Sequence, residues 1–259
     1  VPMWCGVFRC HNLLPVTPMD IMHTFHRRER SMLGPEHCTA LPVSVRLGTM
    51  TDVTIRIGLT GGIAAGKSTV SAHLCDLGAF VIDYDELARE VVAPGSEGLR
   101  RIVDSFGADA LDERGELNRA WMAEQVFSGQ ASAGMRKRLD DIEHPLIYQL
   151  ALRREREAMA ANPQAVIVHD VPLLAEVIDD MPVRFDHIVT VEAPEDMRVR
   201  RMMATRNMSE EQAWARVGHQ SSAQERKAIA DVVIDATHNI ERMFEDVDRL
   251  YAQWRLEAR

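Results

Sequence analysis

The segment at residues 55–70 constrains the fold most, because it reads Ile-Arg-Ile-Gly-Leu-Thr-Gly-Gly-Ile-Ala-Ala-Gly-Lys-Ser-Thr-Val. It contains Gly61-x-x-x-x-Gly66-Lys67-Ser68, which matches the GxxxxGK[ST] pattern of a phosphate-binding P-loop. An apolar run typical of a strand precedes the loop, and a run typical of a helix, Val70 to Leu77, follows it. The motif requires this setting, so the sequence predicts a strand, a phosphate loop and a helix in that order.

Each residue type in the loop suits a part of phosphate binding. Glycines let backbone N–H groups turn inward around a phosphate chain, and Lys67 adds a point charge near the β and γ oxygens. The Ser68 hydroxyl is of the kind that ligates Mg²⁺. We expect the nucleotide to contact Gly61, Gly62, Ala64, Ala65, Gly66, Lys67, Ser68 and Thr69.

Bulk composition excludes several classes of protein. The chain has 259 residues, 46% of them hydrophobic, which suits one sizeable domain, or one domain with a tail. The sequence contains no run of 18 apolar residues, so we expect no membrane-spanning helix. A net charge of −9 disfavours nucleic acid as a partner. The four cysteines lack CxxC spacing, which favours a reduced, cytoplasmic setting.

Residues 1–49 differ in composition from the rest of the chain. They hold Cys5, Cys10 and Cys38, without the paired spacing of a zinc site, and carry more basic than acidic residues. The chain starts with Val, as when an alternative start codon is read literally, and Met50 leads directly into the first expected strand. We therefore expect residues 1–49 to be a non-native or disordered extension, and 50–259 to be the folded domain. An arginine-rich targeting extension is the alternative.

The rest of the chain alternates between strand and helix patterns, which predicts an α/β fold with a parallel sheet. Five short apolar runs read as buried strands: Thr54–Leu59, Ala79–Asp83, Ala165–Asp170, His187–Val191 and Val232–Asp235. Helix starts are expected after Ser96, Asn118, Ser209 and Asn239. A helical stretch over 135–159 is expected to break at His144-Pro145, because proline disfavours helix at the residue before it. About 80 residues separate the second and third strands, far more than one crossover helix needs, so residues about 86–160 are expected to form a helical insertion.

Acidic residues end two of the expected strands. Asp83 and Asp170 lie at strand ends, and Asp85 follows Asp83 closely. Ligands of open parallel sheets bind at the carboxyl edge, where the P-loop also lies. Carboxylates facing a phosphate centre suit proton acceptance from an attacking hydroxyl, or holding Mg²⁺ through water. Helix capping is the alternative for either member of the Asp83 and Asp85 pair.

Several segments together resemble the dephospho-CoA kinase family. The resemblance begins with two segments: Thr60–Thr69, and Val81-Ile-Asp-Tyr-Asp85 with Ala88-Arg89. Further landmarks follow in the family's order: Pro94-Gly95, Gly115-Glu-Leu-Asn-Arg119, Glu143-His-Pro-Leu-Ile147, Val171-Pro-Leu-Leu174 with Glu176, and Ala230–Asp235. The resemblance covers about residues 54–255.

The resemblance implies a P-loop NTPase three-layer fold with a five-stranded parallel sheet, a helical substrate-binding insertion and a helical lid over about 195–225. It implies transfer of a phosphoryl group from ATP, with Mg²⁺, to the ribose 3′-hydroxyl of dephospho-CoA, the last step of coenzyme A synthesis. Asp85 then matches the proposed general base.

The resemblance also implies roles for residues outside the P-loop. Asp83, Arg89 and His144 would bind the acceptor substrate, with Arg89 suited to a phosphate because its planar fork binds oxygens in pairs. Arg201 and Arg206 lie in the lid, where Arg201 would stabilise the transferring phosphate and Arg206 would contact the nucleotide. Asp170 is placed near Mg²⁺ by its location, together with Ser68.

The partners expected are therefore ATP and dephospho-CoA, with no nucleic acid and no membrane, in a monomer or small homo-oligomer. Another small-molecule or nucleoside monophosphate kinase of the same fold is one alternative, because the fold alone does not choose the acceptor. A nucleotide-dependent switch is another, although the sequence lacks the guanine-reading Asn-Lys-x-Asp of a GTPase.

Overall fold

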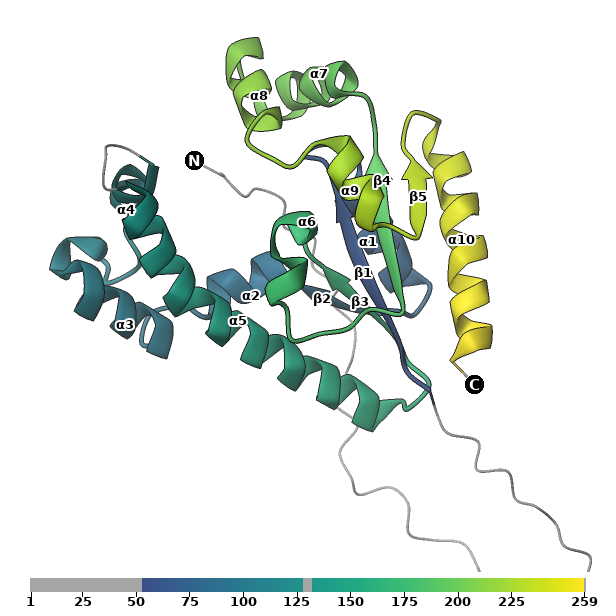
Figure 1. The fold of residues 1–259 in the computed structure, drawn as a ribbon, viewed down its shortest axis with the longest axis horizontal. Helices are drawn as coiled ribbons and strands as arrows, with labels where there is room; N and C mark the ends of the chain where they lie inside the picture. Colours follow the sequence, from purple (N-terminus) through teal and green to yellow (C-terminus); the bar gives the residue numbers. More distant parts are fainter. Residues whose placement is uncertain (1–52, 128–131, 259) are drawn as a thin grey trace, which may run out of the picture. The chain divides into compact units, whose positions relative to one another are not determined.

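The structure is a computed structural model that describes residues 53–127 and 132–258 (Figure 1). The expectations for residues 1–49 and for a natural start at Met50 lie outside the described residues. The described residues belong to one unit of the chain, residues 50–259.

The centre of this unit is a parallel sheet of five strands in the order β2-β3-β1-β4-β5. The strands are β1 (Ile55–Gly61), β2 (Phe80–Asp83), β3 (Val166–Asp170), β4 (His187–Glu192) and β5 (Val232–Asp235). The Val- and Ile-rich runs of the central strands β1, β3 and β4 are largely buried, as parallel strands covered by helices require, whereas the edge strands β2 and β5 are partly exposed. The α/β fold and the five strands expected from the sequence are confirmed.

Side chains of β1 alternate between two helical layers. Ile57 and Leu59 face a core cluster with residues of α1 (Lys67–Asp76) and α10 (Ile240–Glu257). On the other face, a Cβ on Gly58 would lie 3.1 Å from Leu174, which begins α6 (Leu174–Val177). A single 3₁₀ turn, η2 (Ile178–Asp180), follows α6. Helices therefore cover both faces of the sheet, giving three layers (Figure 1).

Helices fill the long interval between β2 and β3. They are α2 (Tyr84–Glu90), α3 (Glu97–Phe106), the 3₁₀ turn η1 (Ala108–Ala110), α4 (Arg119–Phe127) and α5 (Ser132–Ala161). The Ser96 side chain caps α3 and the Asn118 side chain accepts from the Trp121 N–H of α4, as expected. A second apolar cluster joins these helices to Ile82 and Ile167 of the sheet. The role of this segment as a substrate lobe stays a prediction.

The expected helix break at His144-Pro145 is wrong, because α5 runs without interruption through Pro145. Proline removes the N–H that would bond to the residue 141 carbonyl, at a cost of about 3 kcal/mol. Ile147 and Leu150 after it are buried in the second apolar cluster, and Ile142 before it packs against the same cluster. Burying one such side chain contributes about 1.5–3 kcal/mol, so packing on both sides outweighs the lost bond.

Three helices follow β4 and lead into β5: α7 (Glu195–Arg206), α8 (Glu210–Val217) and α9 (Ala223–Ile229). Ser209 and Ser222 open α8 and α9 with complete capping boxes. Val199 and Met202 of α7 form a small apolar cluster that also takes in Ile63 and Ala64 of the P-loop. This part of the chain therefore packs directly on the phosphate loop. Among the described helices, none combines the length and apolar character needed to cross a membrane.

Candidate active site

The P-loop connects β1 to α1 at the carboxyl edge of the sheet. Gly66 precedes α1 with φ 121°, a conformation that favours glycine, and Ala64 has φ 59°. A Cβ on Gly61 would lie 2.6 Å from the Val191 carbonyl oxygen, so only glycine fits where β1 and β4 meet. The loop therefore has the tight backbone that brings N–H groups around a phosphate.

Lys67 and Asp170 form an ion pair at the same edge. Asp170 ends β3 and is 3% exposed, and burial raises the pKa of its carboxyl while the Lys67 ammonium opposes that rise. Ser68 is the second residue of α1, directly after Lys67, and it is exposed. The pairing shows that the expected P-loop lysine and strand-end aspartate are brought together.

Asp83 lies beside Asp170, because β2 and β3 pair in the register Asp83↔Asp170. The Asp83 carboxylate caps α2, accepting from the Asp85 N–H at 2.8 Å and the Glu86 N–H at 3.2 Å. The capping alternative is thus realised by Asp83. It fixes the first turn of α2 and so fixes where Asp85 lies.

Asp85 has a strongly raised pKa. Burial raises the pKa of its carboxyl to about 8, and Asp83 and Asp170 add to the rise, whereas Lys67 and Arg89 oppose it. Desolvation disfavours the charged form, and nearby like charges disfavour it further. A carboxyl with a pKa near neutrality suits proton acceptance, because a general base works best near the operating pH.

Arg89 and His144 belong to the helices between β2 and β3. Arg89 is exposed one turn after Asp85 on α2, close enough to lower the Asp85 pKa. His144 lies along α5, with its Nε2 3.9 Å from an Asp140 carboxylate oxygen and its ring 5.8 Å from that of Tyr148. The structure thus brings Arg89 to the aspartates, while the contacts of His144 are with its own helix. Substrate binding by either residue stays a prediction.

Arg201 of α7 reaches the outside of the P-loop. Its guanidinium donates to the carbonyls of Ala64 at 3.3 Å, Ala65 at 2.8 Å and Ala236 at 2.8 Å. These bonds join α7, the loop and the end of β5. Arg206 ends α7 and is exposed. Contact of either arginine with a phosphate stays a prediction.

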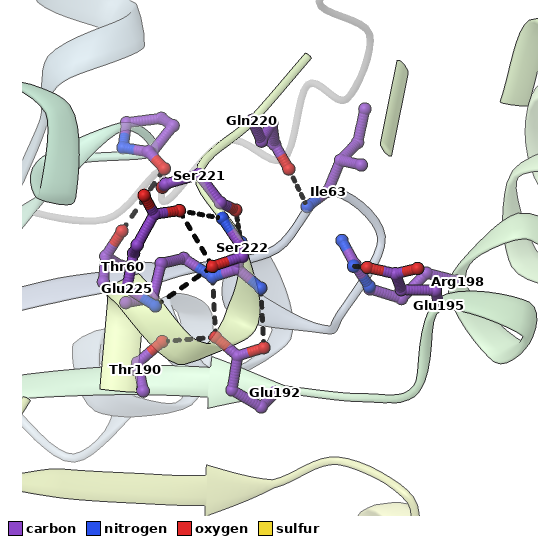
Figure 2. A network of polar contacts seen from close by, with 12 residues as sticks. Thr60, Ile63, Thr190, Glu192, Glu195, Arg198, Gln220, Ser221, Ser222 and Glu225 are labelled. Carbon is purple, nitrogen blue, oxygen red and sulfur yellow. Dashed lines mark hydrogen bonds and ion pairs between the residues drawn. The ribbon is translucent and has the colours of Figure 1, made fainter. Parts of the chain in front are cut away.

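A buried polar network behind the loop was not expected in this form (Figure 2). Glu192 ends β4 and binds Arg226 of α9 through two hydrogen bonds of 2.7 Å, while the Thr190 hydroxyl donates to it at 2.8 Å. The Gln220 side chain accepts from the Ile63 N–H at 2.7 Å. A signal for Glu192 was present, since it is an acidic residue ending an apolar run at the ligand edge.

A second buried network lies behind the aspartates. His169, fully buried next to Asp170, is 3.2 Å from the Tyr84 hydroxyl through Nδ1 and 3.5 Å from Glu155 through Nε2. Glu155 also accepts from Arg56 at 2.6 Å. This network ties α2 and α5 to the sheet beneath the site.

The site suits Mg²⁺ bound together with a nucleotide better than a metal held by protein alone. In the described residues, no group of three or more His, Cys, Asp or Glu side chains has the arrangement of a metal site. Mg²⁺ commonly takes one or two protein oxygens and completes its shell with phosphates and water. The exposed Ser68 hydroxyl and the carboxylates at the strand ends supply oxygens of that kind.

A parallel five-stranded sheet with a P-loop after β1, an ion-paired loop lysine and a buried aspartate defines the class of P-loop kinases. The family model described as dephospho-CoA kinase matches residues 55–242. The chain belongs to the dephospho-CoA kinase family.

Relatives and solved structures agree with this assignment. The chain is 58% identical over 209 residues to a dephospho-CoA kinase of Bifidobacterium longum, covering 80% of this chain and 98% of the relative. It is 42% identical over 199 residues to one of Cutibacterium acnes, covering 77% and 84%. The crystal structure of TT1252 from Thermus thermophilus has 31% identity and a TM-score of 0.64, covering 78% and 98%. Dephospho-CoA kinase from Campylobacter jejuni has 21% identity and a TM-score of 0.52, covering 78% and 97%, and shares the fold.

Proposed function

We propose that the chain transfers the γ-phosphoryl group of ATP to the ribose 3′-hydroxyl of dephospho-CoA, giving coenzyme A and ADP. The observation that carries this proposal is the Asp85 carboxyl, held beside Lys67 and Arg89 with a pKa raised to about 8. Family membership supports the choice of acceptor.

In the proposed mechanism, the loop amides and Lys67 bind the phosphates of ATP. The ionised Asp85 carboxylate accepts the proton of the 3′-hydroxyl while that oxygen forms its bond to the γ-phosphorus. The bond from the γ-phosphorus to the β,γ-bridging oxygen breaks, and ADP leaves with the electron pair. Bound Mg²⁺, held through Ser68 and Asp170, would neutralise charge on the phosphates. Most of the protein's contribution is positioning and charge.

We assign the remaining candidate residues by their surroundings. Asp83 orients Asp85 through the cap of α2, and Arg89 is exposed where it can bind a phosphate of the acceptor. His144 would contact the acceptor from α5. Arg201 holds the P-loop backbone from α7, and closure of residues about 195–225 over ATP would bring it and Arg206 to the nucleotide.

We further propose that residues 50–259 carry this activity, as a cytoplasmic monomer or small homo-oligomer that binds neither nucleic acid nor membrane. Family membership and the match to residues 55–242 support this extent. Size-exclusion chromatography with light scattering gives the oligomeric state. Mass spectrometry of the native protein tests residues 1–49, since peptides from them would contradict a start at Met50.

The experiment that tests the proposed function is an acceptor panel with the full chain and MgATP. ADP release is followed with dephospho-CoA, AMP, adenosine or no acceptor. We expect turnover with dephospho-CoA alone. Turnover with AMP or adenosine but not with dephospho-CoA would show that the acceptor is wrongly assigned. Equal turnover without any acceptor would show that the protein is an ATPase and not a kinase.

A further inference from the structure

Arg198 of α7 is a buried cation with incomplete hydrogen bonding. It is 1% exposed, and its Nε and Nη1 have no hydrogen-bond partner within the part of the chain that the structure describes. Its partner in an ion pair is the Glu195 carboxylate (Figure 2). That carboxylate is 3.6 Å from the Arg198 Nη2, longer than a hydrogen bond, and the Glu195 side chain is 54% exposed. A buried charge that lacks some of its hydrogen bonds is costly, because burial removes its bonds to water and the protein does not replace all of them.

The nearest buried acid compensates Arg198 only in part. Glu192 is already bound by both arms of the Arg226 guanidinium. Burial lowers the pKa of Arg198 and the neighbouring Arg226 lowers it further, whereas Glu192 and Glu195 oppose this shift. Two buried guanidinium groups thus share one buried carboxylate, and one positive charge remains.

Both guanidinium groups lie against the P-loop backbone. A Cβ on Gly62 would lie 2.4 Å from Arg198 Nη1 and 2.9 Å from Arg226 Nη2. Gly62 follows directly on the first glycine of the phosphate-binding motif. The remaining positive charge is therefore packed on the loop that cradles anions, in a low-dielectric interior where its field is weakly screened.

We propose that Arg198 sets the affinity of the P-loop for nucleotide phosphates, with its buried charge only partly compensated in the free protein and more fully compensated by the polyphosphate when it binds. The inference rests on the proposed function, in which ATP binds this loop. Arg198 acts through its field on the loop and is a positioning residue. Removing the charge should therefore stabilise the free protein and weaken ATP binding, two effects of opposite sign that a packing role would not produce.

The test is Arg198→Met in the full chain, which keeps an apolar side chain of similar length. Tm without ligand and Kd for ATP and ADP, by calorimetry in the presence of Mg²⁺, are measured against wild type. We expect a higher Tm, an ATP Kd weakened about tenfold and a smaller loss for ADP, which carries less charge. Arg198→Lys, which keeps the charge, should retain most of the affinity.

Arg200→Met is the matched control, because Arg200 lies on the same helix but is exposed and bonded to Asp196 at 2.6 Å. It should change neither Tm nor Kd. An unchanged ATP Kd in Arg198→Met would overturn the inference, and so would a lower Tm with equal losses for ATP and ADP. If the wild-type protein does not bind ATP, both the proposed function and this inference are wrong. If the wild-type protein binds ATP but the Arg198 variants do not behave as expected, only the inference about Arg198 is wrong.

Discussion

The buried pair of Glu192 and Arg226 should be one of the most sensitive points of the fold. Glu192→Gln keeps the shape of the side chain and removes its charge. In the structure this carboxylate accepts two hydrogen bonds of 2.7 Å from Arg226, and both residues are at most 5% exposed. Without it, Arg226 and the nearby Arg198 would both be buried cations without a buried counter-ion.

Breaking a buried ion pair from one side costs about 3–5 kcal/mol, because the remaining charge stays desolvated. We expect a loss in that range for Glu192→Gln, out of a total stability of about 5–15 kcal/mol for a domain. Urea denaturation of the full chain at pH 7.5, followed by circular dichroism, gives the free energy of unfolding. ATP should recover part of the loss by binding the folded state.

Asp196→Asn is the matched control for this measurement. Asp196 forms an ion pair with Arg200 at 2.6 Å, but its side chain is 58% exposed, so we expect a change below about 0.5 kcal/mol. A loss for Glu192→Gln as small as that of the control would contradict this expectation, since it would mean that Arg226 does not need this buried partner.

Three further results are expected. Burial raises the Asp85 pKa from 3.8 to about 8, so the native state binds this proton more tightly than the unfolded state; the resulting stability is complete below pH 3.8 and is lost as the pH rises through 8. Asp85→Asn lacks this loss, so its Tm relative to wild type should be higher at pH 9 than at pH 5, by the equivalent of about 4 kcal/mol, because the wild type loses about 1.4 kcal/mol for each pH unit between 5 and 8; a pH-independent difference would contradict the raised pKa. Ala64→Gly should stabilise by about 0.5–1 kcal/mol in urea denaturation, because Ala64 has φ 59°; a loss would show that the alanine is unstrained there. Pro145→Ala should raise the free energy of unfolding by about 1–3 kcal/mol, because it restores a backbone hydrogen bond in α5. A lower free energy of unfolding would show that the proline ring stabilises the fold through its packing.

Local sequence signals predicted most of the fold. The β5 bounds came directly from an apolar run ended by an aspartate, and the caps at Ser96 and Asn239 fixed two helix starts, because capping depends on residues three apart. The helix break expected at Pro145 is wrong because the effect of this proline depends on the apolar cluster in which Ile147 and Leu150 are buried, and that cluster includes residues from the rest of the domain. The preference of proline against helix is a local effect and does not include the free energy of this packing.

The candidate site could likewise be predicted only in part from the sequence. Lys67, Asp83 and Asp170 were predicted to share one edge, because parallel strands end together and the P-loop follows the first of them. The contacts of Arg201 with Ala64 and Ala236 were not predicted, since they join segments that are far apart in sequence. Which of several arginines on one helix reaches the loop depends on how α7 packs, and spacing alone does not give that.

The most direct test of the account is phosphoryl transfer to dephospho-CoA by Asp85→Asn, measured as coenzyme A formed in a single turnover with MgATP. Glu86→Gln, next to it on α2 and exposed, is the control. General-base catalysis contributes about 10²- to 10⁴-fold, so we expect a fall in that range for Asp85→Asn, with ATP affinity kept and the control unchanged. Transfer at the wild-type rate by Asp85→Asn would contradict the role of Asp85 as the base.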